Sequence, residues 1–272
     1  MTQDYINKLH KDLRVYINEA VLQNIISESP YKHFKKKKDL GSHKVTLNID
    51  EIAKLESAEF SNNIMWANVA RDMFLFSFYL GGIRFSDVLM MRWSNFDEKW
   101  NECQYTMKKN KKTAPLEVPK QIQDILAKYY NEGCSRNDFI FPLLKDISTE
   151  NLKHMSEDDE MKLDKIIASK NSIVNKALNY ITKKLGLEKH ISFHCARHSF
   201  AKYACDNKMN IKDIQEVLRH TNLKETQQYI GQLNNSDSVK KLFEKSPNRL
   251  KLVQELNNLS EEDLNFVLTK VK

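Results

Sequence analysis

Apolar residues recur at helical spacing along most of this chain. Residues 4–26 carry an apolar side chain at about every third or fourth position, which is typical of one amphipathic helix: Tyr5, Leu9, Leu13, Tyr16, Ile17, Ala20 and Ile25. We expect this helix to end at Ser29-Pro30, because the residue before a proline is pushed out of the helical region. Residues 64–80 are apolar on most faces, which predicts a central buried helix that Gly81-Gly82 ends.

The remaining pattern predicts shorter helices and one pair of strands. Residues 102–109 alternate between two sets of side chains, which is typical of a strand, and residues 116–119 are its expected partner across a turn at 110–113. Asn48 followed by Glu51 is an N-cap signature. Further helices are predicted at 85–93, 121–130, 160–185, 193–205, 211–218, 223–230, 239–244 and 260–271. The fold class that follows is mainly α with a small antiparallel β-sheet.

Composition narrows the class of protein only a little. The 43 Lys and Arg residues exceed the 36 Asp and Glu residues and give a formal net charge of +7, which suits a polyanionic partner. The four cysteines form no Cys-x-x-Cys pair, so we expect reduced thiols and a cytoplasmic protein. The longest apolar run, residues 73–83, is interrupted by Ser77 and is too short to cross a bilayer, so no membrane attachment is predicted.

Candidate chemistry comes from cationic and imidazole side chains that precede one tyrosine. A phosphodiester under attack gathers negative charge on its non-bridging oxygens, and planar guanidinium groups with imidazole donors match those oxygens geometrically. A tyrosine beside them can be the attacking group. The chain offers these groups in a fixed order: Arg84, Lys109, His194, Arg197, His220 and Tyr229.

Several short segments together carry a resemblance to a known family. They are residues 82–87 with Trp93, residues 105–110, residues 194–200, and residues 218–221, followed by Tyr229 nine positions after His220. In this order they resemble tyrosine recombinases, the phage integrase family, and most of all integrases of bacterial mobile elements. The resemblance extends over residues 47 to about 243. It implies site-specific cutting and rejoining of DNA, for integration or excision of a mobile element.

The resemblance implies a role for each residue around the phosphate. Arg84 and Arg197 grip the scissile phosphate, and Asp87 braces Arg84 through an ion pair. His194 is a proton acceptor or a phosphate donor, and a helix places it on the same face as Arg197. His198 is a structural neighbour that supports the site.

Three further candidates complete the implied reaction. Tyr229 forms a 3′-phosphotyrosine link, and His220 helps to stabilise the phosphate oxygens. Lys109, at the hairpin turn, is the general acid for the leaving 5′ oxygen, because strand alternation separates it from Lys108. Lys111 is the alternate. The chemistry demands no metal and no nucleotide cofactor, because the new ester conserves the energy of the broken bond.

Basic residues outside this set are candidates for DNA contact. They are Lys35, Lys36, Lys37, Lys38, Lys108, Lys111, Lys112 and Arg219. The lysine run at 35–38 equally suits a solvated surface linker. Arg219 stands where the family has a glycine, so it either strains the backbone through its β-carbon or supplies a phosphate contact.

Four regions are predicted along the chain. Residues 1–30 are interpreted as the C-terminal helix remnant of a core-binding domain, 31–46 as a basic linker, 47–245 as the catalytic domain, and 246–272 as a helical tail that docks on a neighbouring protomer. The implied partners are double-stranded DNA attachment sites, a homo-tetramer on paired sites, and accessory DNA-bending proteins. The implied location is the bacterial cytoplasm, at the nucleoid.

Three alternatives stay open at the level of sequence. A type IB topoisomerase uses similar groups and relaxes DNA without strand exchange. A DNA-binding regulator without catalysis keeps the basic surface and loses a key group, whereas all six positions are filled here. A metal site of His194, His198 and His220 is conceivable because the first two are four residues apart, although no glutamate follows His194 and no cysteine pair is matched to it.

Overall fold

The computed structural model describes residues 3–35, 37, 44–61, 66–109, 113–145, 156–220 and 222–234. The chain divides into two compact units, Met1–His43 and Lys44–Lys272. Some predictions therefore lie outside the described residues: those for Lys36, Lys38, Lys111 and Lys112, and the helices expected at 239–244 and 260–271.

The described residues of the first unit form α1 (Gln3–Leu22) and a segment that follows it. The helix predicted at 4–26 ends earlier than expected, because Asn24 adopts a left-handed φ of 56°, a conformation that asparagine tolerates. The Nδ1 atom of His10 lies 3.0 Å from the hydroxyl oxygen of Tyr31, and the Phe34 ring contacts both rings. The segment after α1 therefore packs back onto the helix.

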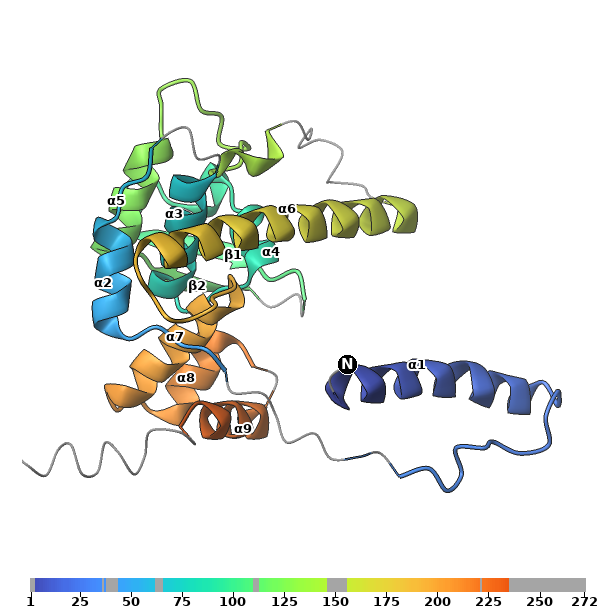
Figure 1. Cartoon of the computed structure of the whole chain (residues 1–272). Coiled ribbons are helices and arrows are strands. Elements are labelled where there is room, and N and C mark those ends of the chain that lie inside the picture. The colour runs from blue at the N-terminus through green and yellow to red at the C-terminus, as the bar shows by residue number, and fades with distance from the viewer. Residues whose placement is uncertain are drawn as a thin grey trace, which may run out of the picture. The chain divides into compact units, whose positions relative to one another are not determined.

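The second unit is mainly helical, and its described residues contain one two-stranded antiparallel sheet, which confirms the predicted fold class (Figure 1). The helices are α2 (Ile49–Ser57), α3 (Ala67–Tyr79), α4 (Phe85–Leu89), α5 (Lys120–Tyr129), α6 (Glu157–Lys184), α7 (His194–Asp206), α8 (Ile211–Leu218) and α9 (Leu223–Asn234). The strands are β1 (Glu102–Thr106) and β2 (Thr113–Glu117), and 3-10 turns lie at Trp93–Asn95 and Pro142–Leu144. Among the described residues, no helix combines the length and the apolar character needed to span a bilayer.

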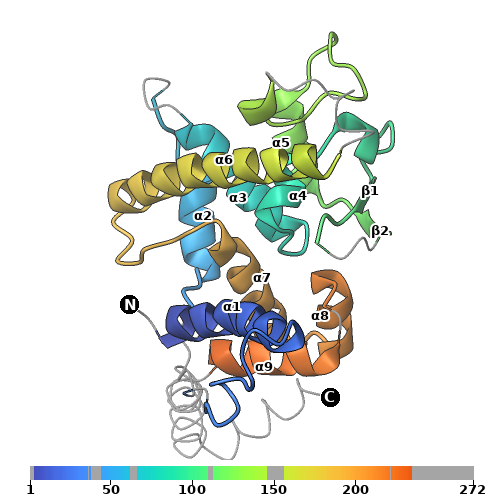
Figure 2. The ribbon, with the colours of Figure 1, turned by 90° about the vertical axis from the view of Figure 1, so that its right-hand side faces the viewer.

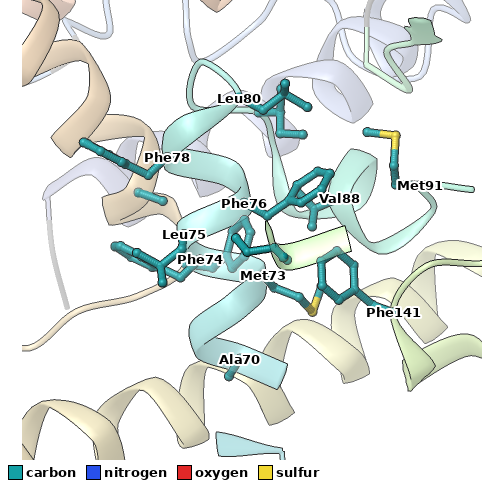
Figure 3. Packing of buried hydrophobic residues seen from close by; sticks show 14 of the residues in the cluster. Ala70, Met73, Phe74, Leu75, Phe76, Phe78, Leu80, Val88, Met91 and Phe141 are labelled. Carbon is teal, nitrogen blue, oxygen red and sulfur yellow. The ribbon is translucent and has the colours of Figure 1, made fainter. Parts of the chain in front are cut away.

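The predicted central helix is α3, which packs against α2, α4, α5, α6 and α7. Residues 70–78 of this helix are all buried, and Figure 3 shows how its apolar side chains, among them Met73, Phe74 and Phe76, pack in the core. The Phe76 ring meets Phe141 edge-on, with 5.4 Å between centroids. The helix begins at Ala67, three residues later than predicted, directly after Trp66, whose positive φ of 73° is not helical.

Two predicted elements near the site are shorter or displaced. The helix expected at 85–93 ends at Leu89, because the backbone N–H of Trp93 donates instead to the carbonyl of Asp138 on a neighbouring loop. The second strand starts at Thr113 instead of 116, since Thr113 pairs with Thr106 in the antiparallel register. Thr113 therefore belongs to the strand and not to the turn.

The last three helices form a small assembly with its own apolar cluster (Figures 1 and 2). Ala201 and Ala204 of α7 pack there with Ile214, Leu218 and Tyr229. This cluster sets Tyr229 on the face of α9 that looks toward α7.

Candidate active site

Arg197 occupies a point where three segments meet. Its Nη1 atom donates to the carbonyl of Gly82 at 2.8 Å, and its Nη2 atom donates to the carbonyl of Leu218 at 2.5 Å. Gly82 has a φ of +72°, and a β-carbon there would lie 3.0 Å from the Cα atom of Arg197. The glycine therefore permits both the left-handed turn after α3 and the close approach of α7. Arg84 follows this turn directly, as the N-cap residue of α4.

The two arginines predicted to grip a phosphate share one pocket with His194. A pocket of about 130 Å³ is lined by Arg84, His194 and Arg197, with Asn171 and Asn175 of α6 on its wall. Burial, followed by the charge of Arg84, lowers the pKa of Arg197 to about 10. Two guanidinium groups that disfavour each other's charge favour binding of an anion between them.

His194 lies at the start of α7 on the exposed side of this pocket. Desolvation of the ring lowers its pKa to about 4, and the charges of Arg197, Lys44, Arg84 and Lys109 add to the effect. His194 is thus a neutral imidazole beside a positive cluster, accessible to an anion that enters from solvent.

Tyr229 is nine-tenths buried, and its hydroxyl is hydrogen-bonded to Nδ1 of His198. Burial raises the pKa of Tyr229, while the charges of Arg197 and Arg84 oppose the rise. The phenol is therefore close enough to both arginines to feel their charge. The arrangement brings four of the six predicted candidates, Arg84, His194, Arg197 and Tyr229, to one place.

His198 has a more direct contact than the supporting role that the sequence suggested. Desolvation, followed by the charges of His194, Lys44 and Arg197, lowers its pKa to about 3. Nδ1 of the neutral imidazole accepts from the Tyr229 hydroxyl when the ring proton is on Nε2, and it donates to the phenolic oxygen when the proton is on Nδ1. The i, i+4 spacing from His194 placed both rings on one helical face, but the spacing did not indicate the tyrosine.

His220 completes the surroundings of the tyrosine. It is buried, its Nδ1 atom lies 2.9 Å from the hydroxyl oxygen of Thr226, and its ring centroid lies 5.5 Å from that of Tyr229. The bond to Thr226 fixes the plane of the ring. His220 therefore joins the other predicted candidates.

Asp87 does not form the predicted ion pair with Arg84. Its Oδ1 atom accepts the backbone N–H of Lys108 at 2.9 Å, and its buried Oδ2 atom has no hydrogen-bond partner. Burial raises the pKa of Asp87, although the Lys108 N–H and the nearby arginines favour its ionised form. The shorter arm of aspartate reaches the hairpin and stops short of the guanidinium group.

Lys108 and Lys109 lie in the turn after β1, because the strand expected at 102–109 ends at Thr106, and strand alternation therefore does not separate them. Lys108 forms an ion pair with Asp164 of α6, whereas Lys109 is exposed and its charge reaches His194. This arrangement favours Lys109 over Lys108 as the group facing the site. In the first unit, Lys35 and Lys37 are exposed.

The prediction that Arg219 contacts DNA is wrong for this structure, because the side chain is buried. Only 5% of its surface is exposed, its guanidinium carbon lies 4.3 Å from the centroid of the Tyr105 ring, and its Nη1 atom donates to the Tyr105 carbonyl at 3.3 Å. A guanidinium group that is buried against an aromatic ring cannot reach a DNA phosphate in this conformation. The expectation of strained backbone is confirmed, because Arg219 adopts a left-handed φ of 52° at the end of α8.

Lys44 is a site residue that sequence reasoning placed in the linker. Its ammonium nitrogen lies 3.9 Å from the centroid of the Tyr229 ring. No sequence signal identifies this contact, since the two residues are far apart in the chain and a lysine in a basic stretch is ordinarily solvated.

The metal alternative is not supported by the geometry. In the part of the chain that the structure describes, no three His, Cys, Asp or Glu side chains are grouped as ligands of a metal ion would be. His194, His198 and His220 therefore do not form the site that their spacing allowed.

Comparisons with known proteins identify the family of the chain. Residues 59–235 match the model of the phage integrase family. A tyrosine recombinase of Thermosipho africanus is 25% identical over 239 residues, which cover 87% of this chain and 75% of the relative. The tyrosine recombinase XerD of Listeria innocua is 24% identical over 224 residues, 80% of this chain and 68% of the relative.

Solved structures show the same fold. The XerA recombinase aligns with a TM-score of 0.50 and 19% identity, over 87% of this chain and 82% of that one. The integrase of the transposon Tn1549, solved with a circular intermediate DNA, aligns with a TM-score of 0.57 and 15% identity, over 84% of this chain and 75% of that one.

Proposed function

Since the chain belongs to the phage integrase family, whose model matches residues 59–235, we propose that it is a site-specific recombinase that cuts and rejoins DNA through a 3′-phosphotyrosine intermediate. One observation carries the proposal. The guanidinium groups of Arg84 and Arg197 line one pocket with His194, and the phenol of Tyr229 lies within reach of their charges. A phosphodiester in that pocket has its counter-charge and its nucleophile together.

The reaction needs one proton acceptor and one proton donor. The phenolic oxygen of Tyr229 attacks phosphorus, the bond from phosphorus to the 5′ oxygen breaks, and a 3′-phosphotyrosine ester forms. His198 is bonded to the phenol and takes its proton, whereas His194, at the pocket, donates to a phosphate oxygen. Lys109 gives a proton to the departing 5′ oxygen.

The second half of the reaction reverses the first with a different DNA end. A 5′ hydroxyl attacks the phosphotyrosine ester, the tyrosine leaves, and the DNA strand is rejoined. Because one ester replaces another at each step, the reaction proceeds without a metal ion or hydrolysis of ATP.

The proposed substrate is double-stranded DNA with a pair of attachment sites. The net charge of +7 and the exposed Lys35 and Lys37 suit a DNA backbone. Exchange between two duplexes cuts four strands, so four protomers on paired sites, with accessory DNA-bending proteins, are proposed as the assembly. The Tn1549 integrase and the XerH recombinase were solved with bound DNA, and they are the precedent for this partner.

The ends of the chain are proposed to support this assembly. Residues 1–30 contribute a helix of a core-binding domain, and residues 246–272 dock on a neighbouring protomer. Removal of residues 246–272 should change the stoichiometry on paired sites, as measured by native mass spectrometry. The same stoichiometry with and without these residues would contradict docking in trans.

A nicked suicide substrate tests the proposed chemistry. The nick lets a short oligonucleotide leave after cleavage, so the protein remains linked to DNA and migrates as a covalent adduct. Tyr229→Phe should abolish the adduct, whereas Tyr203→Phe, a matched change at a tyrosine that is 44% exposed on α7, should retain it. Adduct formation by the Tyr229 variant would overturn the proposal.

Relaxation of supercoiled DNA separates the second candidate, a type IB topoisomerase. We expect recombination between two attachment sites to produce joined products. Efficient relaxation without such products favours the topoisomerase.

A further inference from the structure

A short segment at the start of the second unit crosses helix α7 and is held at several points. This segment, residues 44–47, is called the strap. The backbone N–H of Leu47 donates to the hydroxyl of Ser199 at 2.8 Å, and this hydroxyl donates to the carbonyl of Cys195 at 2.7 Å. Both serine contacts are buried. The strap is thus joined to the helix that carries His194, Arg197 and His198.

A lysine from another loop holds the same strap from the side. The Nζ atom of Lys189 donates to the carbonyl of Thr46 at 3.1 Å and forms an ion pair with Glu51 at 2.6 Å. Lys189 lies between α6 and α7, and Glu51 lies in the first turn of α2. The backbone that follows Lys44, at Thr46 and Leu47, is therefore fixed by contacts that do not involve the Lys44 side chain.

The strap directs the Lys44 side chain onto the nucleophile proposed above. The ammonium nitrogen lies 3.9 Å from the centroid of the Tyr229 ring, inside the range in which a cation is attracted to an aromatic face. Burial and the charge of Arg197 lower the pKa of Lys44, and the charge of Lys44 is felt by His194 and His198. The ammonium group therefore lies inside the catalytic cluster and is not part of the solvated linker.

Three contacts together restrict the Tyr229 ring. His198 holds the hydroxyl, His220 meets the ring at 76° between planes, and Lys44 covers a face. The two histidines come from α7 and from the turn before α9, whereas Lys44 comes from the strap. Without the ammonium group, that face loses its attractive partner and the ring gains freedom to tilt.

We propose that Lys44 is a positioning residue for Tyr229, whose ammonium group holds the ring so that the hydroxyl stays against His198 beside the arginine pocket. This inference rests on the proposed function, because it concerns the residue assigned there as the nucleophile. Lys44 acts through Tyr229 and makes no bond to the reacting phosphorus.

Fluorine NMR of the DNA-free protein tests the contact itself. The ten tyrosines are replaced by 3-fluorotyrosine, and the Tyr229 resonance is assigned from its loss in Tyr229→Phe. Lys44→Met, which keeps the chain length and removes the charge, should shift and narrow this resonance, whereas Lys44→Arg should retain its position and width. Lys54→Met, at an exposed position on α2, is the matched control, and the Tyr105 resonance reports that the unit is folded. An unchanged Tyr229 resonance in Lys44→Met overturns the proposal.

Single-turnover cleavage separates positioning from a simple DNA contact. At saturating nicked DNA, Lys44→Met should cleave about fivefold more slowly, the loss expected for one cation on an aromatic face, with an unchanged DNA dissociation constant. Lys44→Arg should restore the rate. Weaker DNA binding with a normal rate at saturation makes Lys44 a phosphate contact and overturns the proposal.

The two measurements distinguish failure of this inference from failure of the proposed function. If the wild-type protein forms no adduct, the proposed function fails, while the fluorine spectra still decide whether Lys44 holds the ring. If the wild-type protein cleaves and Lys44→Met matches it in rate and spectrum, the inference alone fails.

Discussion

The Oδ1 atom of Asp87 accepts the backbone N–H of Lys108 at 2.9 Å, although the two residues are 21 positions apart in the chain. Asp87 lies in α4, three residues after Arg84, and Lys108 lies just after β1 and before Lys109. One carboxylate thus joins the segment that carries Arg84, proposed to bind the phosphate, to the segment that carries Lys109, the proposed general acid. Its other oxygen is buried without a hydrogen-bond partner.

The stability of Asp87→Asn should depend on pH in a defined direction. Burial raises the pKa of Asp87 above its ordinary value of 3.8, so the folded protein binds this proton more tightly than the unfolded chain. The carboxyl group therefore stabilises the fold at low pH and loses that contribution as pH rises through the folded-state pKa. Asparagine stays neutral and keeps an acceptor for Lys108. We expect Asp87→Asn to be more stable than the wild type at pH 7.5, with a difference that shrinks toward pH 4.

Urea unfolding at both pH values measures this difference in the free energy of unfolding. Asp87→Ala is the matched control, because it removes the charge and also leaves the Lys108 N–H without its partner, a loss of about 1 kcal/mol. A stability gain in the alanine variant as large as that in the asparagine variant would show that the hydrogen bond contributes nothing.

The proton acceptor can be identified from the pH dependence of cleavage by two histidine variants. A general base contributes typically about 10²- to 10⁴-fold to a rate. We expect His198→Gln to lose a factor of this size at pH 7 and to regain part of it at alkaline pH, where more of the phenol is ionised. His194→Gln should lose rate without such recovery, because a phosphate donor is not replaced by hydroxide.

Single-turnover adduct formation between pH 6 and 10 provides this measurement. The wild-type rate should not fall between pH 8 and 6 through protonation of either histidine, since the pKa values of His194 and His198 are lowered to about 4 and about 3. Alkaline recovery in His194→Gln and not in His198→Gln would reverse the two assignments.

The bounds of a helix were predicted well where residues at its own ends, such as an N-cap, determine where it starts and stops. Helix α8 has the predicted bounds, because Asn210 caps its first turn by accepting the Lys212 N–H at 2.9 Å, and Arg219 ends it in a left-handed conformation. The central helix was found from its apolar run, but its start was predicted three residues too early, since the positive φ of Trp66 has no sequence signal.

The site was predicted as a set of residues and not as a set of contacts. The resemblance brought Arg84, Arg197 and Tyr229 together, and the structure places them within reach of one another's charge. The bond from Tyr229 to His198 and the position of Lys44 over its ring depend on how α9 and the strap pack against α7. Helical spacing fixes the face of one helix on which a residue lies, but it does not name the partner across the interface.

Gly82→Ala should separate backbone strain from the close approach of α7. Alanine at a φ of +72° costs about 1–2 kcal/mol in any surroundings, and here its β-carbon would also lie 3.0 Å from the Cα atom of Arg197. Gly186→Ala is a matched control, because its φ is +63° and no atom lies within 4 Å of the added carbon.

We expect Gly186→Ala to lose about 1–2 kcal/mol of unfolding free energy, Gly82→Ala to lose more because of its contact with Arg197, and only Gly82→Ala to lose cleavage activity in addition. Thermal or urea unfolding gives the first quantity, and adduct formation at a temperature where both variants are folded gives the second. Equal cleavage by the two variants would mean that the turn after α3 does not set the position of Arg197.

The general acid can be identified with a substrate whose leaving group needs no proton. Lys109 is exposed and its charge reaches His194, whereas the ammonium group of Lys108 is paired with Asp164. A sulfur atom in place of the bridging 5′ oxygen leaves as a thiolate, because a thiol has a pKa of about 8.5 and is a much stronger acid than an alcohol. We therefore expect Lys109→Ala to cleave ordinary DNA about 10²-fold or more slowly than the wild type does, and to cleave the 5′-thio substrate at nearly the wild-type rate.

Lys108→Ala is the matched control and should be slowed far less, because removing a lysine from a largely exposed ion pair costs little and leaves the proton donor in place. Rescue of Lys108→Ala by the sulfur substrate, with no rescue of Lys109→Ala, would assign the acid to Lys108 and show that the ion pair with Asp164 opens when DNA binds.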